Sequence, residues 1–222
     1  RDDLSQKPEI YRSEANYPLE RGGKMIIPSP LPWGEWQKVL ARAYAQVTLV
    51  DAAGGLILDA LDELGLSQNT LVIWSTDHGD GLACHGGHFD KRSYMPEEMI
   101  RVPFAMRWPG RIASNQASDA LVSTIDLAPT FLDAAGANFP RPVDGESLLP
   151  LSVGAEIEWR QDLMCETHGH GEDHIGRVVV SDRYKYVANK GQIDELYDLE
   201  TDPFELTNLI DSDGATLSDM RN

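Results

Sequence analysis

Apolar residues recur at spacings of three and four between Glu35 and Leu64, which is the period of an amphipathic helix. The positions are Leu40, Ala43, Tyr44, Val47, Val50, Gly54, Ile57, Leu61 and Leu64. Gly65 follows the last of them, as expected at the end of a helix. Gly54 and Gly55 lower the helix propensity of the interior, which indicates close packing against a neighbour.

The next pattern is a continuous apolar, β-branched run from Thr70 to Ser75. Such a run is typical of a strand buried on both faces of a parallel sheet. A helix, a short link and a buried strand form half of a βαβ unit. We expect a second strand over Val102–Trp108 and a helix over Ile125–Ala135.

The pattern changes after about Pro150, where short strands alternate with turns. The predicted strands are Asp162–Glu166, Gly176–Val180, Tyr184–Ala188 and Glu195–Tyr197, with a short helix near Pro203 and a frayed tail from Asp211. Residues 1–34 have neither period and are read as irregular. We therefore predict an α/β domain over 1–150, with a sheet flanked by helices, and a small antiparallel subdomain over 151–222.

Composition narrows the class of protein. The 222 residues include 19 basic and 36 acidic side chains, a net charge of −17, and are 41% apolar, which excludes a wholly disordered chain. The acidity argues against nucleic acid or an anionic membrane as a partner, although a bound cation would still allow an anionic substrate. We expect no membrane span, because no apolar run reaches about 18 residues. The chain begins at Arg1 without a targeting segment, so we expect a processed chain or a fragment.

The densest polar cluster follows the predicted strand directly: Thr76-Asp77-His78-Gly79-Asp80-Gly81, then His85-Gly86-Gly87-His88. In open α/β sheets, ligands bind beyond the carboxyl ends of the strands. Asp77 would supply a hard oxygen and His78 a nitrogen to a cation. The alternative is that Asp77 starts a turn and His78 packs under the loop. Lys91 could hold an anion beside that cation, or it could be an ordinary surface lysine.

One stretch resembles the second half of sequences of the sulfatase family, in the alkaline-phosphatase-like superfamily: NTLVIWSTDHGDGLACHGGHFDKRSYMPEEMIRVPFAMRWPGRI. The order of parts is similar: a strand, Thr-Asp-His-Gly, a Gly- and His-rich loop, Lys, an acidic pair and Arg-Val-Pro. YAQVTLVDAAGGLILDALDELGL, STIDLAPTFLDAAGA and RYKYVANKGQIDELYDLETDPFELTNL extend the resemblance over about residues 35–210. It implies an alkaline-phosphatase-like fold and hydrolysis of a sulfate monoester.

The resemblance also implies roles for single residues. Asp77 and His78 match two ligands of the family's divalent cation, usually Ca²⁺, although many members have Asn at the second position. Lys91 matches the lysine that contacts the sulfate oxygens. His85 aligns loosely with a loop histidine near the substrate. The implied partner is a sulfated small molecule or carbohydrate, and the implied location is periplasmic or secreted.

The family's nucleophile is a formylglycine made within Cys/Ser-x-Pro/Ala-x-Arg, and neither Cys84 nor Cys165 lies in that pattern. The family's N-terminal Asp pair for the metal also has no match. We therefore expect the second part of a longer sulfatase, inactive by itself, whose nucleophile lies in a missing N-terminal half.

A last cluster, Cys165-Glu166-Thr167-His168-Gly169-His170-Gly171-Glu172-Asp173-His174, leaves three alternatives open. It could bind a transition metal, border the substrate pocket through His168 and His170, or form a plain surface turn.

Two rival functions also remain. One is a phosphonate or phosphodiester hydrolase of the same superfamily, and the other is a non-catalytic module that keeps the fold.

Overall fold

The computed structural model describes residues 4–14, 32–82, 84–86, 91, 93–169 and 173–221. These residues form two compact units, each described here by itself. Unit 1 comprises residues 1–45, 78–102 and 164–222, and unit 2 comprises residues 46–77 and 103–163. The predicted boundary at residue 150 stays a prediction.

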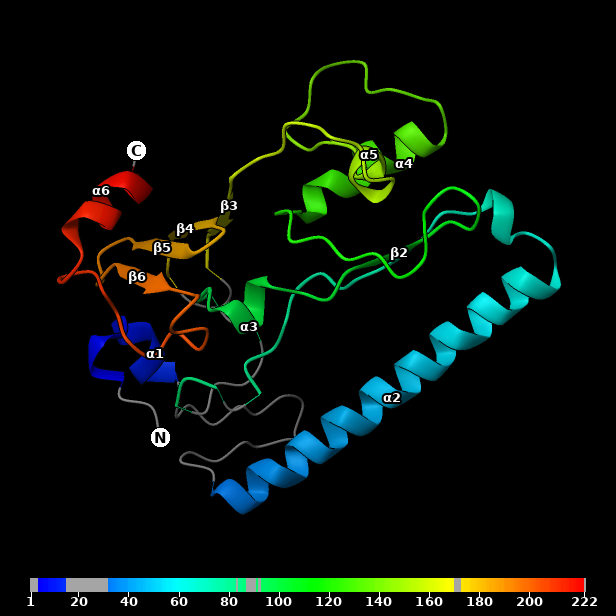
Figure 1. Cartoon of the computed structure of the whole chain (residues 1–222). Helices are drawn as coiled ribbons and strands as arrows, with labels where there is room; N and C mark the ends of the chain where they lie inside the picture. The colour runs from blue at the N-terminus through cyan, green and yellow to red at the C-terminus, as the bar shows by residue number, and fades with distance from the viewer. Residues whose placement is uncertain are drawn as a thin grey trace. The chain divides into compact units, whose positions relative to one another are not determined.

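The predicted long helix is α2, Trp33–Glu63, which Figure 1 shows as one continuous element. It is followed by the 3-10 turn η2 (Ser67–Asn69), and Gly65 has the positive φ of +67° that ends a helix. In unit 2, α2 packs closely on the strand β1 (Val72–Trp74), because a Cβ at Gly54 would lie 2.5 Å from the Trp74 ring. The close packing expected at Gly54 is therefore confirmed.

The strand β1 pairs with β2 (Ala105–Arg107), and Ile73 lies opposite Met106. The pairing is antiparallel, and Trp74 is 44% exposed. The expectation of a strand buried on both faces of a parallel sheet is thus wrong for the described residues. A continuous apolar run predicts an extended segment, but strand direction is set by which neighbour supplies the hydrogen bonds.

In the rest of unit 2, the buried carboxylate of Asp126 connects several loops. The turn η3 (Thr124–Asp126) leads into α4 (Leu127–Ala134), near the predicted helix, and α5 (Leu149–Ser152) follows. Asp126 is fully buried and accepts hydrogen bonds from the backbone N–H groups of Ser123 and Glu146. Both terminal nitrogens of Arg160 also donate to it, at 2.8 and 2.7 Å. These contacts tie three loops to the start of α4.

Unit 1 contains the predicted antiparallel sheet, with strand order β3-β4-β5-β6 (Figure 1). The strands are β3 (Asp162–Thr167), β4 (Gly176–Ser181), β5 (Tyr184–Asn189) and β6 (Glu195–Asp198), within a residue of the predicted bounds. Val178 lies opposite Val187, and Lys185 opposite Tyr197. Because side chains alternate along a strand, Lys185, Val187 and Glu195 share one face.

That face is covered by the segment around α3 (Glu97–Ile100), since Met95 packs on Val178 and Val187. The N-terminal residues add a second cluster, in which Tyr11 packs with Tyr94 and Met99. Residues 1–34 are therefore not wholly irregular, because η1 (Leu4–Gln6) and α1 (Glu9–Glu14) precede α2. Near the C-terminus no helix starts at Pro203 among the described residues, and α6 spans Gly214–Arg221 where a frayed tail was expected.

By length and composition, α2 could cross a membrane. Between Arg42 and Asp59 its only charged residue is Asp51. We expected no membrane span because no unbroken apolar run is long enough. The length and mean hydropathy of α2 nevertheless suffice for a span, even with one acidic residue inside it. A long apolar helix that packs inside a protein has the same length and composition, so these two properties alone do not assign α2 to a membrane.

Candidate functional site

The predicted ligand pair lies where β1 gives way to a loop. Asp77 is exposed at the end of unit 2, and the hydroxyl of Thr76 donates to its Oδ1 at 3.2 Å. His78 opens the next segment of unit 1 and is half-buried. Its Nδ1 lies 2.7 Å from the Gly79 carbonyl oxygen. Because a carbonyl oxygen only accepts, Nδ1 donates in this contact, and Nε2 is the ring nitrogen that could offer a lone pair to a cation.

Gly79 fixes the path of the loop after His78. Its N–H donates to the carbonyl oxygen of Met99 at 2.9 Å. A Cβ at this position would lie 1.7 Å from the carbonyl oxygen of Glu98, which leaves no room for a side chain. The loop therefore runs directly against the backbone of α3, and only glycine permits that approach.

His85 lies further along the same loop and is 2% exposed. Its Nε2 donates to Oε2 of Glu98 at 3.1 Å, and its ring meets the Tyr11 ring edge-on at 5.6 Å between centroids. Burial alone would raise the pKa of Glu98, but the hydrogen bond and charge of His85 lower it to about 2. This enclosed position favours an internal role for His85 over the predicted contact with substrate.

His85, Glu98 and Glu205 form a group that could hold a metal ion, with one donor atom from each within 4.8 Å of the others. Oε1 of Glu205 lies 2.7 Å from Nζ of Lys185, and Glu97 lies 3.3 Å from the same nitrogen. An ammonium group already compensates this carboxylate, which favours an ion-pair network over a cation site. Glu97 and Glu98 begin the short helix α3, and their side chains contact Lys185 and His85 respectively.

The sequence reasoning missed Lys185 and Glu205 in this network. The signal for Lys185 was its alternation with Val187 in β5, which places a charge on the apolar face. Glu205 follows the turn at Asp202-Pro203 and gave no comparable signal.

The remaining predicted residues are dispersed. Lys91 is half-buried in unit 1. His168 follows β3 and is 68% exposed, with Nε2 3.5 Å from Glu166. Arg177 lowers the pKa of Glu166 through a hydrogen bond. His170 lies outside the described residues, and within the described residues Cys84 and Cys165 are not joined by a disulfide.

The third histidine of that cluster has an internal role. His174 is 3% exposed, and its two ring nitrogens lie 2.9 Å from the Ser93 carbonyl oxygen and from Oδ1 of Asn189. It therefore connects the loop after Lys91 to β5. A transition-metal site made of the three clustered histidines is not supported by this arrangement, since both ring nitrogens of His174 are engaged.

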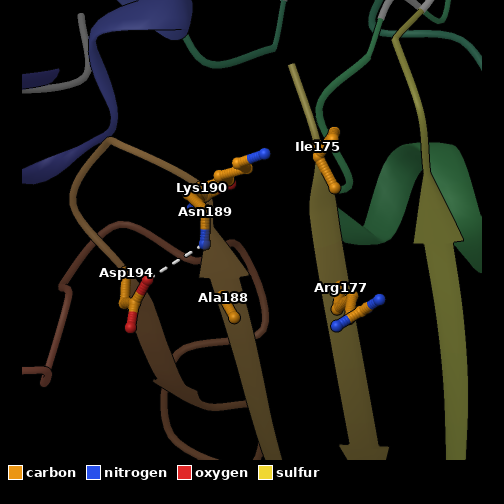
Figure 2. Close-up of a pocket in the computed structure, with 6 residues that line it drawn as sticks. All are labelled: Ile175, Arg177, Ala188, Asn189, Lys190 and Asp194. Atoms are coloured by element: carbon orange, nitrogen blue, oxygen red, sulfur yellow. Dashed lines mark hydrogen bonds between the residues drawn. The ribbon is translucent and has the colours of Figure 1, made fainter.

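A hollow of about 440 Å³ lies beside β4 and β5 (Figure 2). Its lining residues are Ile175, Arg177, Ala188, Asn189, Lys190 and Asp194. Asp194 accepts hydrogen bonds from the Asn189 N–H, the Tyr186 hydroxyl and Arg221, so its carboxylate is occupied. None of the predicted site residues lines this hollow.

Comparison with known proteins identifies sulfatases among the relatives of this chain. The sulfatase family model matches residues 5–137, and the model "N-sulphoglucosamine sulphohydrolase, C-terminal" matches residues 84–220. Arylsulfatase K of the dog, Canis lupus familiaris, is 37% identical over 79% of this chain and 34% of its own length. The chain thus spans about a third of that relative.

Two solved structures share the fold. BT4656, in complex with its substrate D-glucosamine-2-N,6-O-disulfate, matches with a TM-score of 0.73 and 28% identity, over 79% of this chain and 37% of its own. The phosphonate monoester hydrolase of Agrobacterium radiobacter matches with a TM-score of 0.76 and 29% identity, over 88% and 42%. These matches support an alkaline-phosphatase-like α/β architecture.

Proposed function

Because this chain belongs to the sulfatase family, we propose that it is part of a sulfuric ester hydrolase that cleaves a sulfate monoester with the help of a divalent cation. The proposed substrate is a sulfated carbohydrate or small molecule, which is supported by the sugar disulfate bound by BT4656. The proposed nucleophile is a formylglycine from a part of the enzyme outside these residues.

The observation that carries this proposal is the pair Asp77-His78 at the carboxyl end of β1. A carboxylate oxygen and an imidazole Nε2 with its lone pair are both donors for a divalent cation. The Nδ1 contact of His78 with Gly79 fits that use of the ring. Ca²⁺ takes six to eight ligands, so these two would form part of its site, with the others from elsewhere in the enzyme.

When bound, such a cation would draw negative charge from the sulfuryl oxygens. The part assigned to this chain is to hold ligands and orient the anion. Lys91 would place its ammonium group on the sulfate, and its charge would favour the transition state. His168 and His170 stay proposed neighbours of the pocket.

A missing N-terminal half is the proposed partner. The proposal is supported by the share of arylsulfatase K that this chain covers and by apolar side chains along α2. Tyr44, Val47 and Leu56 are 68%, 65% and 71% exposed, although all lie in an apolar helix. Exposed apolar side chains in such numbers are typical of a surface that another part of a protein covers.

The test is hydrolysis of an aryl sulfate by the full-length protein, expressed with the formylglycine-generating enzyme. We expect activity that chelation abolishes and that Asp77→Asn lowers by roughly 10²-fold or more, because a ligand is lost. The 222-residue chain alone should show no turnover, and measurable turnover would contradict the missing-nucleophile argument.

The similarity to the phosphonate hydrolase supports a second candidate, hydrolysis of a phosphonate or phosphodiester. A threonine in place of the Cys/Ser motif upstream, or preference for a phosphonate ester over an aryl sulfate, would favour it. A non-catalytic module predicts no hydrolysis of either ester by the full-length protein.

A further inference from the structure

We propose that Glu205 is a positioning residue for the loop 78–86, which it reaches through α3 and His85. The inference rests on the proposed function, because this loop follows the proposed ligand pair and precedes Lys91. Every residue in the argument belongs to unit 1.

Glu205 joins three segments through one carboxylate. It is 1% exposed, and its Oε2 accepts a hydrogen bond from the N–H of Glu97 at 2.9 Å. Its Oε1 pairs with Lys185 of β5 at 2.7 Å. Nε2 of His85 lies 3.9 Å from Oε2, so the start of α3, the sheet and the loop meet at this group.

The helix α3 depends on such contacts, because it has four residues and cannot be stable by itself. Glu205 satisfies the N–H at its first turn, which has no partner within a helix. Lys185 of β5 also reaches the Glu97 carboxylate, so both the backbone N–H and the side chain of Glu97 are held.

The loop is in turn attached to α3 at two points. Gly79 donates to the carbonyl oxygen of Met99, and His85 donates to Glu98. A shift of α3 would therefore move the backbone next to His78. Glu205 is far from that loop in the sequence but controls it through one short helix.

The backbone at both ends of the His85–Glu205 contact supports this role. His85 has φ of 46° and Glu205 has φ of 54°, in the left-handed region that non-glycine residues rarely adopt. Such conformations persist where surrounding contacts hold them. The ring of His85 is enclosed, and its Nδ1 finds no hydrogen-bond partner among the described residues, so it serves the fold around the loop.

The first experiment is hydrogen–deuterium exchange on the full-length enzyme carrying Glu205→Gln. We expect about tenfold faster exchange for the segment 78–82, because a charge-assisted contact that holds α3 is lost. The amides of β5 should exchange within twofold of wild type. Glu200→Gln, with an exposed side chain, is the matched control and should leave both segments unchanged.

A second pair of variants covers the case in which Glu205→Gln fails to fold. His85→Asn tolerates the left-handed backbone but cannot reach Glu98, so it should also loosen residues 78–82 about tenfold. His85→Gln keeps a donor near the place of Nε2 and should restore exchange to within about threefold. In activity, Glu205→Gln and His85→Asn should lower kcat about tenfold and leave KM within about twofold.

Unchanged exchange at 78–82 in a folded Glu205→Gln variant would overturn the inference, and if that variant does not fold, unchanged exchange in His85→Asn would overturn it. Equal acceleration in β5 would also overturn it, since Glu205 would then merely support the whole unit. An inactive wild-type enzyme would count against the proposed function, while the exchange data would still decide the role of Glu205.

Discussion

Gly79→Ala tests whether the loop after His78 is held against α3. The new Cβ would lie 1.7 Å from the Glu98 carbonyl oxygen and 2.8 Å from its carbon. Backbone atoms cannot rotate away, so the loop or α3 must move by more than an ångström. The Gly79–Met99 hydrogen bond would then break. We expect a loss of about 3 kcal/mol in the free energy of unfolding, from the hydrogen bond and the strain together.

The measurement is urea unfolding of the protein followed by far-UV circular dichroism. Gly55→Ala is the matched control, because a Cβ there meets nothing within 4 Å inside α2. Alanine is the better helix former, so the control should gain about 0.5–1 kcal/mol. If Gly79→Ala unfolds within 0.5 kcal/mol of wild type, as an open surface position would, the close approach of the loop to α3 is refuted.

Further predictions concern charge. Lys91→Ala in the full-length enzyme should lower kcat/KM by roughly 10²-fold through loss of a contact to the sulfate, and an effect below threefold would make Lys91 a surface residue. The pKa of Glu98 is about 2, below its ordinary value, so its pairing with His85 stabilises the fold above about pH 5 and is lost as the pH falls towards 2. Between pH 7 and pH 3 wild type should therefore lose about 2 kcal/mol more of its free energy of unfolding in urea than Glu98→Gln does, and equal losses would contradict the assignment. Asp126→Asn should cost about 3 kcal/mol by leaving Arg160 unpaired in a buried site, and a loss below 1 kcal/mol would show that the pair is dispensable.

Much of this protein could be predicted from local patterns. The helix α2, the strands β1 to β6 and the antiparallel character of the C-terminal sheet follow from apolar period and turn residues, which act between near neighbours in the chain. The family followed from the joint order of several motifs around Asp77, and the family model confirms it.

Strand pairing and the burial of single side chains depend on contacts between residues far apart in the sequence, and only the tertiary structure reveals them. The period of a strand does not encode its partner, so the antiparallel pairing of β1 with β2 was missed. His168 and His174 likewise lie in one cluster in the sequence. In the structure, however, the ring of His168 is exposed and that of His174 is buried.

By itself, the sequence determined the helix α2, the strands and the choice of Asp77 and His78 as candidate ligands, because spacing and neighbouring residue types suffice for these. Only the folded chain could bring Glu205 to Lys185 and to the loop of His85. Those groups are far apart in the sequence, and a buried charge acquires its partner when the sheet and α3 pack together.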